Sequence, residues 1–164
     1  MNPASSHPDP LQELARACRS GGVLHRFHAR PLLLLLGKCI LAGETEQGER
    51  WRREIEEAVA LHREAWTRAV LEELEMACVE HVRSVDPRFL SRPDYDLHYV
   101  VEAREELEAR LAAAECLNID TPDRLLRQVL AADERLAPRL AGDRPLQRPA
   151  APGAGSGPAH DAIP

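Results

Sequence analysis

The stretch from Glu46 to Val85 contains no proline, and its only glycine is Gly48. Its apolar side chains recur every three or four positions, which is the spacing of one face of an α-helix. A helix of about 40 residues rises close to 60 Å, which is longer than a domain of this size is wide. Such a helix needs several partner helices to cover its apolar face. The sequence therefore predicts an all-helical protein built around one long central helix.

The apolar seam of this helix is expected to face the core. It comprises Trp51, Ile55, Val59, His62, Trp66, Val70, Leu74, Ala77, His81 and Val85. The mean step along the seam is somewhat above 3.6 residues, which favours slight right-handed winding or a local irregularity over a left-handed heptad coiled coil. A bent or interrupted helix therefore stays open as an alternative to a straight one.

Thr45 is the predicted N-cap of the long helix. Four further helices are expected around it. Capping residues, prolines and glycines place them at about 10–20, 31–42, 93–117 and 122–137. With residues 1–9 as a flexible N-terminus, residues 10–137 form one antiparallel bundle of about five helices, and residues 23–30 fit either a helix or an extended segment. Residues 138–164 are rich in Pro, Gly and Ala, so we expect a disordered C-terminal tail.

Specific apolar and sulfur-containing side chains are expected inside this bundle. The last helix is predicted to bury Leu125, Leu126, Val129, Leu130 and Leu136. The cysteines are far apart in the chain and form no CxxC pair, so we expect buried free thiols in helices rather than a disulfide framework. They are Cys18, Cys39, Cys78 and Cys116.

The composition argues against several classes of partner. Acidic residues outnumber basic ones by 27 to 21, and the formal net charge is -6. Nucleic acids and anionic membrane surfaces are bound through Lys and Arg, so we expect neither as a partner. The most apolar run, from Pro31 to Ala42, is shorter than the roughly 20 residues that a membrane span needs and contains Lys38. Without a recognisable secretory signal, we expect a cytoplasmic protein.

Three histidines suggest the one metal or cofactor site that we infer from the sequence. If the 31–42 helix and the long helix pack antiparallel about the turn at 43–45, counting outward from the turn brings His28 beside His62 and His25 close by. Imidazole binds zinc, copper, nickel and haem iron. A metal or haem site at His25, His28 and His62 is therefore one hypothesis, and histidines held only by packing and hydrogen bonds are the other. The sequence identifies no other cofactor.

The segment from residue 86 to 96 is dense in turn formers and charged residues. Exposed arginines and aromatics beside rigid helices are typical of protein-binding surfaces. The alternative is that these side chains only pack the turn. The predicted contact residues are Arg88, Phe89, Arg92, Tyr95 and Tyr99.

No catalytic signature is present in the sequence. It contains no glycine-rich phosphate loop, dinucleotide fingerprint or GxSxG motif, and no histidine has a glutamate three positions before it, as di-iron bundles require. By elimination, we expect a non-catalytic intracellular accessory, regulatory or adaptor protein that binds another protein, with a homodimer through the long helix as a further option. A metal- or haem-binding bundle and an enzyme of unknown reaction are the alternatives.

Overall fold

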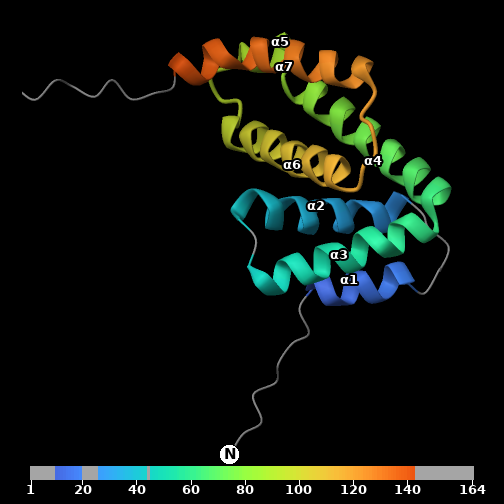
Figure 1. Ribbon diagram of the computed structural model, residues 1–164. Coiled ribbons are helices and arrows are strands. Elements are labelled where there is room, and N and C mark those ends of the chain that lie inside the picture. Colours follow the sequence, from blue (N-terminus) through green and yellow to red (C-terminus); the bar gives the residue numbers. More distant parts are fainter. Residues whose placement is uncertain (1–9, 20–25, 44, 143–164) are drawn as a thin grey trace, which may run out of the picture.

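The computed structural model describes residues 10–19, 26–43 and 45–142, and these residues form helices joined by short connections (Figure 1). Within these ranges there is no β-strand, which confirms the predicted all-helical class. None of the helices found there combines the length and the apolar character that crossing a membrane requires. The helices are α1 (Pro10–Arg19), α2 (Arg26–Ala42), α3 (Glu46–Leu61), α4 (Arg63–Ser84), α5 (Pro87–Leu90), α6 (Leu97–Cys116) and α7 (Asp123–Gly142).

Helix α4 contacts more of the other long helices than α1 does. It packs against α2, α6 and α7, whereas α1 packs mainly on α3. Helix α2 also packs closely on α6, so α2 lies between α6 and the α1 and α3 pair (Figure 1). The single turn of α5 contacts α7. The antiparallel order of the helices stays a prediction.

The described core consists of two clusters of buried apolar side chains. The larger one contains residues of α1, α2, α3, α4, α6 and the first half of α7. Its biggest fully buried members include Trp66, Leu32 and Leu107. The smaller one contains Val85, Leu90, Val100, Ala132 and Leu136. Because Leu90 belongs to α5, the second cluster holds that short turn against α7 and the beginning of α6.

The expected single helix from Glu46 to Val85 is interrupted at His62, so the prediction of one long central helix is wrong. His62 has φ −124° and ψ 39°, outside helical geometry, and its N–H donates to the carbonyl of Val59 at 3.2 Å. The seam residues before and after the break are buried, with Trp51 half-buried, but His62 is exposed. Helix α3 packs on α1 and α4 packs on α2, α6 and α7, so tertiary packing overrides a local sequence that favours continuous helix.

Arg63, the first residue of α4, joins this break to the end of α6. Its guanidinium donates to the carbonyl of Leu117 at 2.9 Å and also to the carbonyl of Asn118. Asn118 has φ 54°, and the N–H of Ile119 reaches the carbonyl of Ala114 at 2.9 Å, which is a Schellman C-cap. The cation thus meets carbonyl groups left free at the negative end of the α6 dipole.

Side-chain caps fix the starts of α3 and α6. The start of α3 agrees with the prediction, and the start of α6 differs from it. The predicted cap Thr45 accepts a hydrogen bond from the N–H of Gly48 at 3.1 Å. Helix α6 begins at Leu97 instead of about Pro93, because Asp96 caps it by accepting from the N–H of His98 at 3.0 Å. A local cap therefore determined this boundary more strongly than the upstream proline did.

Prolines lie inside two helices that were expected to begin or end at them. Helix α2 begins at Arg26 rather than at Pro31. Helix α7 continues through Pro138 to Gly142, so the helical region extends past residue 137. Each proline removes one N–H donor near a helix end, where neighbouring turns and tertiary packing continue the helix. The predicted flexible segment 1–9 and residues 143–164 of the predicted tail lie outside the described residues.

Helix α7 buries a narrower stripe than the sequence suggested. Leu125, Val129 and Leu136 are buried as predicted, but Leu126 and Leu130 are exposed. The buried positions, together with Ala132, follow one face at three- and four-residue spacing. The other two leucines lie off that face, so a single packed face accounts for the difference.

Candidate functional site

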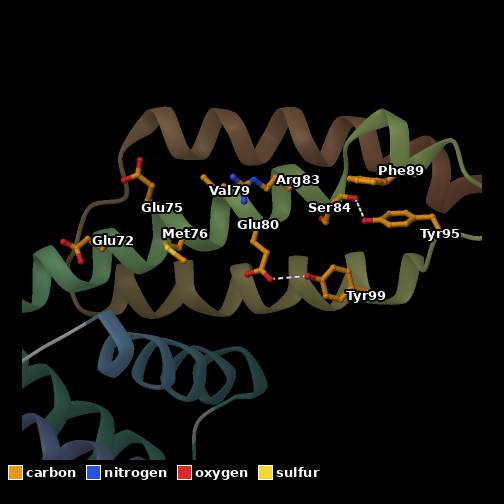
Figure 2. A pocket seen from close by; sticks show the side chains of 10 residues that line it. All are labelled: Glu72, Glu75, Met76, Val79, Glu80, Arg83, Ser84, Phe89, Tyr95 and Tyr99. Atoms are coloured by element: carbon orange, nitrogen blue, oxygen red, sulfur yellow. Dashed lines mark hydrogen bonds between the residues drawn. The ribbon is translucent and has the colours of Figure 1, made fainter.

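A cavity of about 870 Å³ lies along α4, between the α5 turn and the beginning of α6 (Figure 2). We call it the α4 groove. Its lining residues are Glu72, Glu75, Met76, Val79, Glu80, Arg83, Ser84, Phe89, Tyr95 and Tyr99. Most of them come from one helix, so the shape of the groove is set largely by the rigid backbone of α4.

Helical spacing explains why α4 has both a buried face and a groove face. Residues 72, 75, 76, 79, 80 and 83 follow the i, i+3, i+4, i+7, i+8, i+11 pattern of one helix face, and they therefore share one side of the helix. The buried positions Val70, Leu74, Ala77 and His81 lie on another side, toward the core. From residue 72 to 83 the groove face extends about 16 Å along the helix axis.

The groove exposes a cluster of large apolar side chains. Met76 is 52% exposed and Val79 is 39% exposed, and Phe89 and Tyr99 expose comparable fractions. Acidic and basic side chains surround them (Figure 2). Contiguous exposed apolar surface with a polar rim is typical of interaction sites, whereas single exposed apolar residues are ordinary.

An aromatic pair forms one end of the groove. The rings of Phe89 and Tyr95 stack with centroids 5.7 Å apart and an interplanar angle of 22°. The Tyr95 hydroxyl donates to the carbonyl of Ser84 at 2.8 Å, and partial burial raises the pKa of Tyr95. Asp86 caps α5 by accepting from the N–H of Arg88 at 2.8 Å. These contacts hold the aromatic end in place before any ligand binds.

A hydrogen bond between Tyr99 and Glu80 forms part of the groove wall. The Tyr99 hydroxyl donates to Glu80 Oε1 at 3.2 Å, and the negative carboxylate raises the pKa of Tyr99 (Figure 2). The same two residues line a second cavity of about 210 Å³, together with Glu106 and Arg110. The bond between them therefore lies where the groove and this smaller cavity meet.

The groove lining carries more negative than positive charge. Three carboxylates, from Glu72, Glu75 and Glu80, face one guanidinium, from Arg83. Glu75 also forms an ion pair with Arg124 at 2.9 Å, and this hydrogen bond lowers the pKa of the Glu75 carboxyl. The carboxylates of Glu72 and Glu75 lie toward the N-terminal half of α4, and Arg83 lies toward the aromatic end (Figure 2).

A buried ionic network lies between α4 and α6. Arg110 is almost fully buried and pairs with Glu73 at 3.2 Å and with Glu106 at 3.2 Å. Burial raises the pKa of Glu73 even though the guanidinium acts in the opposite direction. Removing one partner of such a network would leave an uncompensated buried charge, so these residues help to keep the two helices that border the groove in register.

The structure places three of the five predicted contact residues in the groove and two outside it. Phe89, Tyr95 and Tyr99 line it, while Arg88 and Arg92 do not. Arg88 pairs with Asp86 at 2.7 Å, and Arg92 pairs with Asp94 at 3.2 Å. The contribution of all five to binding stays a prediction.

Sequence reasoning missed the α4 residues of the groove. Met76 and Val79 lie off the apolar seam of the long helix. Apolar residues away from a helix seam are the signal that points to a second contact surface, but the sequence does not show whether another helix covers them.

The histidines proposed as metal ligands are not assembled in the described residues. His28 and His62 are both exposed, and His25 lies outside those residues. Helix α3 packs on α1, which differs from the pairing used to count the register. Across residues 10–19, 26–43 and 45–142 no group of three or more His, Cys, Asp or Glu side chains could share an ion. The site that includes His25 stays a prediction.

The four cysteines are free thiols, as expected, and Cys18 and Cys78 are buried, whereas Cys39 and Cys116 are only half-buried. Burial raises the pKa of Cys18 to about 11. Burial and the adjacent Glu56 carboxylate raise the pKa of Cys116 to about 12, and burial also raises the pKa of Cys78. A thiol with a raised pKa is a poor nucleophile near neutral pH, because the thiolate is the reactive form.

His81 is buried between α4 and α7, outside the groove. Its Nε2 lies 2.9 Å from Asp133 Oδ1, and Asp133 also accepts from Arg104 Nε at 2.9 Å. Desolvation lowers the pKa of His81 despite the nearby carboxylate. His81 thus acts as a buried polar link between α4 and α7.

The chain matches no protein-family model, and neither the curated proteins nor the solved structures contain a match to it. The function must therefore be inferred from the geometry and charge of the groove.

Proposed function

We propose that the protein is a non-catalytic accessory or adaptor protein that binds another protein through the α4 groove. The supporting observation is the cluster of exposed apolar side chains held on rigid helices and bordered by charge. An interface core needs apolar and aromatic anchors with a polar rim, and Met76, Val79 and Phe89 provide such anchors. The proposal includes a cytoplasmic location and an antiparallel bundle as the scaffold.

The stacking of Phe89 on Tyr95 and the bond from Tyr95 to Ser84 favour binding without large rearrangement. Side chains that are already ordered lose little conformational entropy when a partner binds. Phe89 and Tyr95 lie together at one end of the groove (Figure 2). A partner side chain placed there would therefore meet a preformed surface.

Photo-crosslinking from the groove in the native cell tests this proposal. A photoreactive phenylalanine analogue would replace Val79 in the full chain, and a matched variant would carry it at Leu130. Leu130 is 62% exposed on α7 and does not line the groove. We expect a discrete protein adduct from position 79 that is absent from position 130 and is lost when Met76→Asp is added.

The same experiment has a clear contrary outcome. If position 79 gives no adduct, or if positions 79 and 130 give the same adducts, the α4 groove is not a specific binding site. Circular dichroism melting of each variant confirms that the fold is intact. All three substituted positions, 76, 79 and 130, are exposed on helices, so the variants should melt close to the unmodified protein.

A further inference from the structure

We infer that the occupant of the α4 groove is a basic amphipathic α-helix of the partner protein. This inference rests on the proposed function and specifies the chemistry of the partner. Three features of the groove support it: its hydroxyl groups already donate hydrogen bonds within the protein, its length fits a short helix, and its lining has more carboxylates than cations.

The hydrogen-bonding groups of the groove favour a helix over an extended peptide. An extended peptide needs both donors and acceptors for its backbone, as a strand edge supplies. The hydroxyls of Ser84, Tyr95 and Tyr99 already donate to other groups, and carboxylates only accept. Arg83 is the remaining cationic donor in the lining. A helix satisfies its backbone internally and requires none of these groups.

The dimensions of the groove fit a short helix. Its α4 face extends about 16 Å, which corresponds to about three turns. Met76 and Val79 lie in the middle of this length, and Phe89 lies toward one end (Figure 2). A partner helix with apolar residues at three- and four-residue spacing would place one side chain per turn along these anchors.

The charge of the lining favours basic residues beside that apolar face. Glu72 has no ion-pair partner among the residues that the structure describes, and Glu80 accepts only the neutral hydroxyl of Tyr99. Lys or Arg side chains of a bound helix could pair with both carboxylates at the rim. The formal net charge of -6 would also speed the approach of a basic partner at low salt.

Model peptides with the full chain test this inference by fluorescence anisotropy. The first is a Lys/Leu peptide of about 18 residues with leucines on one helical face. The second has the same composition with Lys and Leu alternating, and the third keeps the leucines of the first but has Glu in place of Lys. We expect the first to bind at least about tenfold more tightly than the other two, with affinity that falls as salt is raised.

Carboxylate variants locate the binding. The double variant Glu72→Gln and Glu80→Gln should bind the first peptide about three- to tenfold more weakly, with a smaller salt dependence. The matched double variant Glu57→Gln and Glu64→Gln removes two exposed carboxylates outside the groove and should bind as the unmodified chain does. The inference is overturned by equal binding of the Glu peptide or the alternating peptide, or by equal loss of affinity in both double variants.

Sequencing the partner segment in the adduct from position 79 separates this inference from the proposed function. A basic segment with helical apolar spacing supports both. An acidic segment, or one without that spacing, supports the groove as a protein-binding site and overturns the basic helix as its occupant.

Discussion

At the scale of single residues, buried polar side chains set the response of the fold to pH. His81 is fully buried, and desolvation lowers its pKa below the ordinary value of 6.5. The groups that face it are Asp133, Arg104 and Arg135. In the unfolded chain the imidazole binds a proton at a higher pH than it does in the folded chain. The contribution of this difference to stability is therefore present above pH 6.5 and is lost as the pH falls toward the folded-state pKa.

We predict that replacing His81 reduces the loss of stability in mild acid. Urea unfolding at about pH 7.5 and about pH 5.5 should show a smaller difference in the free energy of unfolding for His81→Gln than for the unmodified chain. A pKa difference of one unit corresponds to about 1.4 kcal/mol. The control is His98→Gln, since His98 is exposed on α6, and its pH dependence should match the unmodified chain. Equal pH dependence in all three proteins would contradict the assigned role of His81.

At the scale of helices, one glycine sets how closely α2 and α6 pack. A methyl group added at Gly37 would lie 1.8 Å from the carbonyl oxygen of Ala109. This oxygen belongs to the backbone of α6, so the two helices would have to move apart. The sequence contains Gly37 inside a leucine-rich helix, where glycine is unfavourable, and the close contact with α6 explains its presence.

We predict that Gly37→Ala destabilises the fold by about 1–3 kcal/mol or more. Alanine favours an isolated helix over glycine by about 1 kcal/mol, so the clash must outweigh that gain. The matched control is Gly142→Ala at the end of α7, where an added methyl group has no neighbour within 4 Å. Thermal melting should place the control at or slightly above the unmodified chain. A higher melting temperature for Gly37→Ala would show that α2 and α6 do not pack as described.

The sequence predicted which segments are helical better than it predicted where one helix ends and the next begins. Periodic apolar residues and the cap Thr45 located the start of α3 and most of the seam. The long step of the seam left an interrupted helix open, but the position of the break at His62 was not predictable, because neither glycine nor proline marks it and its causes lie elsewhere in the chain. Arg63 binds carbonyls at the end of α6, and α3 and α4 pack on different helices. These contacts exist only in the assembled fold.

The groove residues were likewise predicted only in part: those in or beside one loop were found, and those that depend on how the helices pack were missed. Phe89, Tyr95 and Tyr99 were predicted because they lie in or beside a loop rich in turn formers. Met76, Val79 and the acidic rim were missed because the sequence does not show which face of α4 the other helices leave exposed. Arg88 and Arg92 were grouped with the aromatics by proximity in sequence, but their side chains pair with neighbouring aspartates outside the groove.

At the scale of the whole molecule, α4 connects the larger core cluster, the smaller one and the groove. Trp66, Val70 and Leu74 belong to the larger cluster, while Val82 packs against the smaller one. The groove lies on the remaining side of the same helix. Opening α4 would therefore require separating it from α2, α6 and α7 together, whereas α1 could separate from its neighbours while α4 stays packed.

Native-state hydrogen exchange tests this order of stability. Amides in the middle of α4, around residues 70–81, should exchange most slowly, with a protection free energy close to that of global unfolding. Amides of α1 should exchange through local unfolding that costs less free energy, because α1 packs mainly on α3 and contacts α2 less. A basic helical peptide bound to the groove should slow exchange in α4 and α6 more than in α1, since its contacts lie on the groove side. The contrary result is one common exchange rate for the amides of α1 and α4, with and without peptide. The helices would then open as a single unit, and α4 would not be the rigid support of the groove.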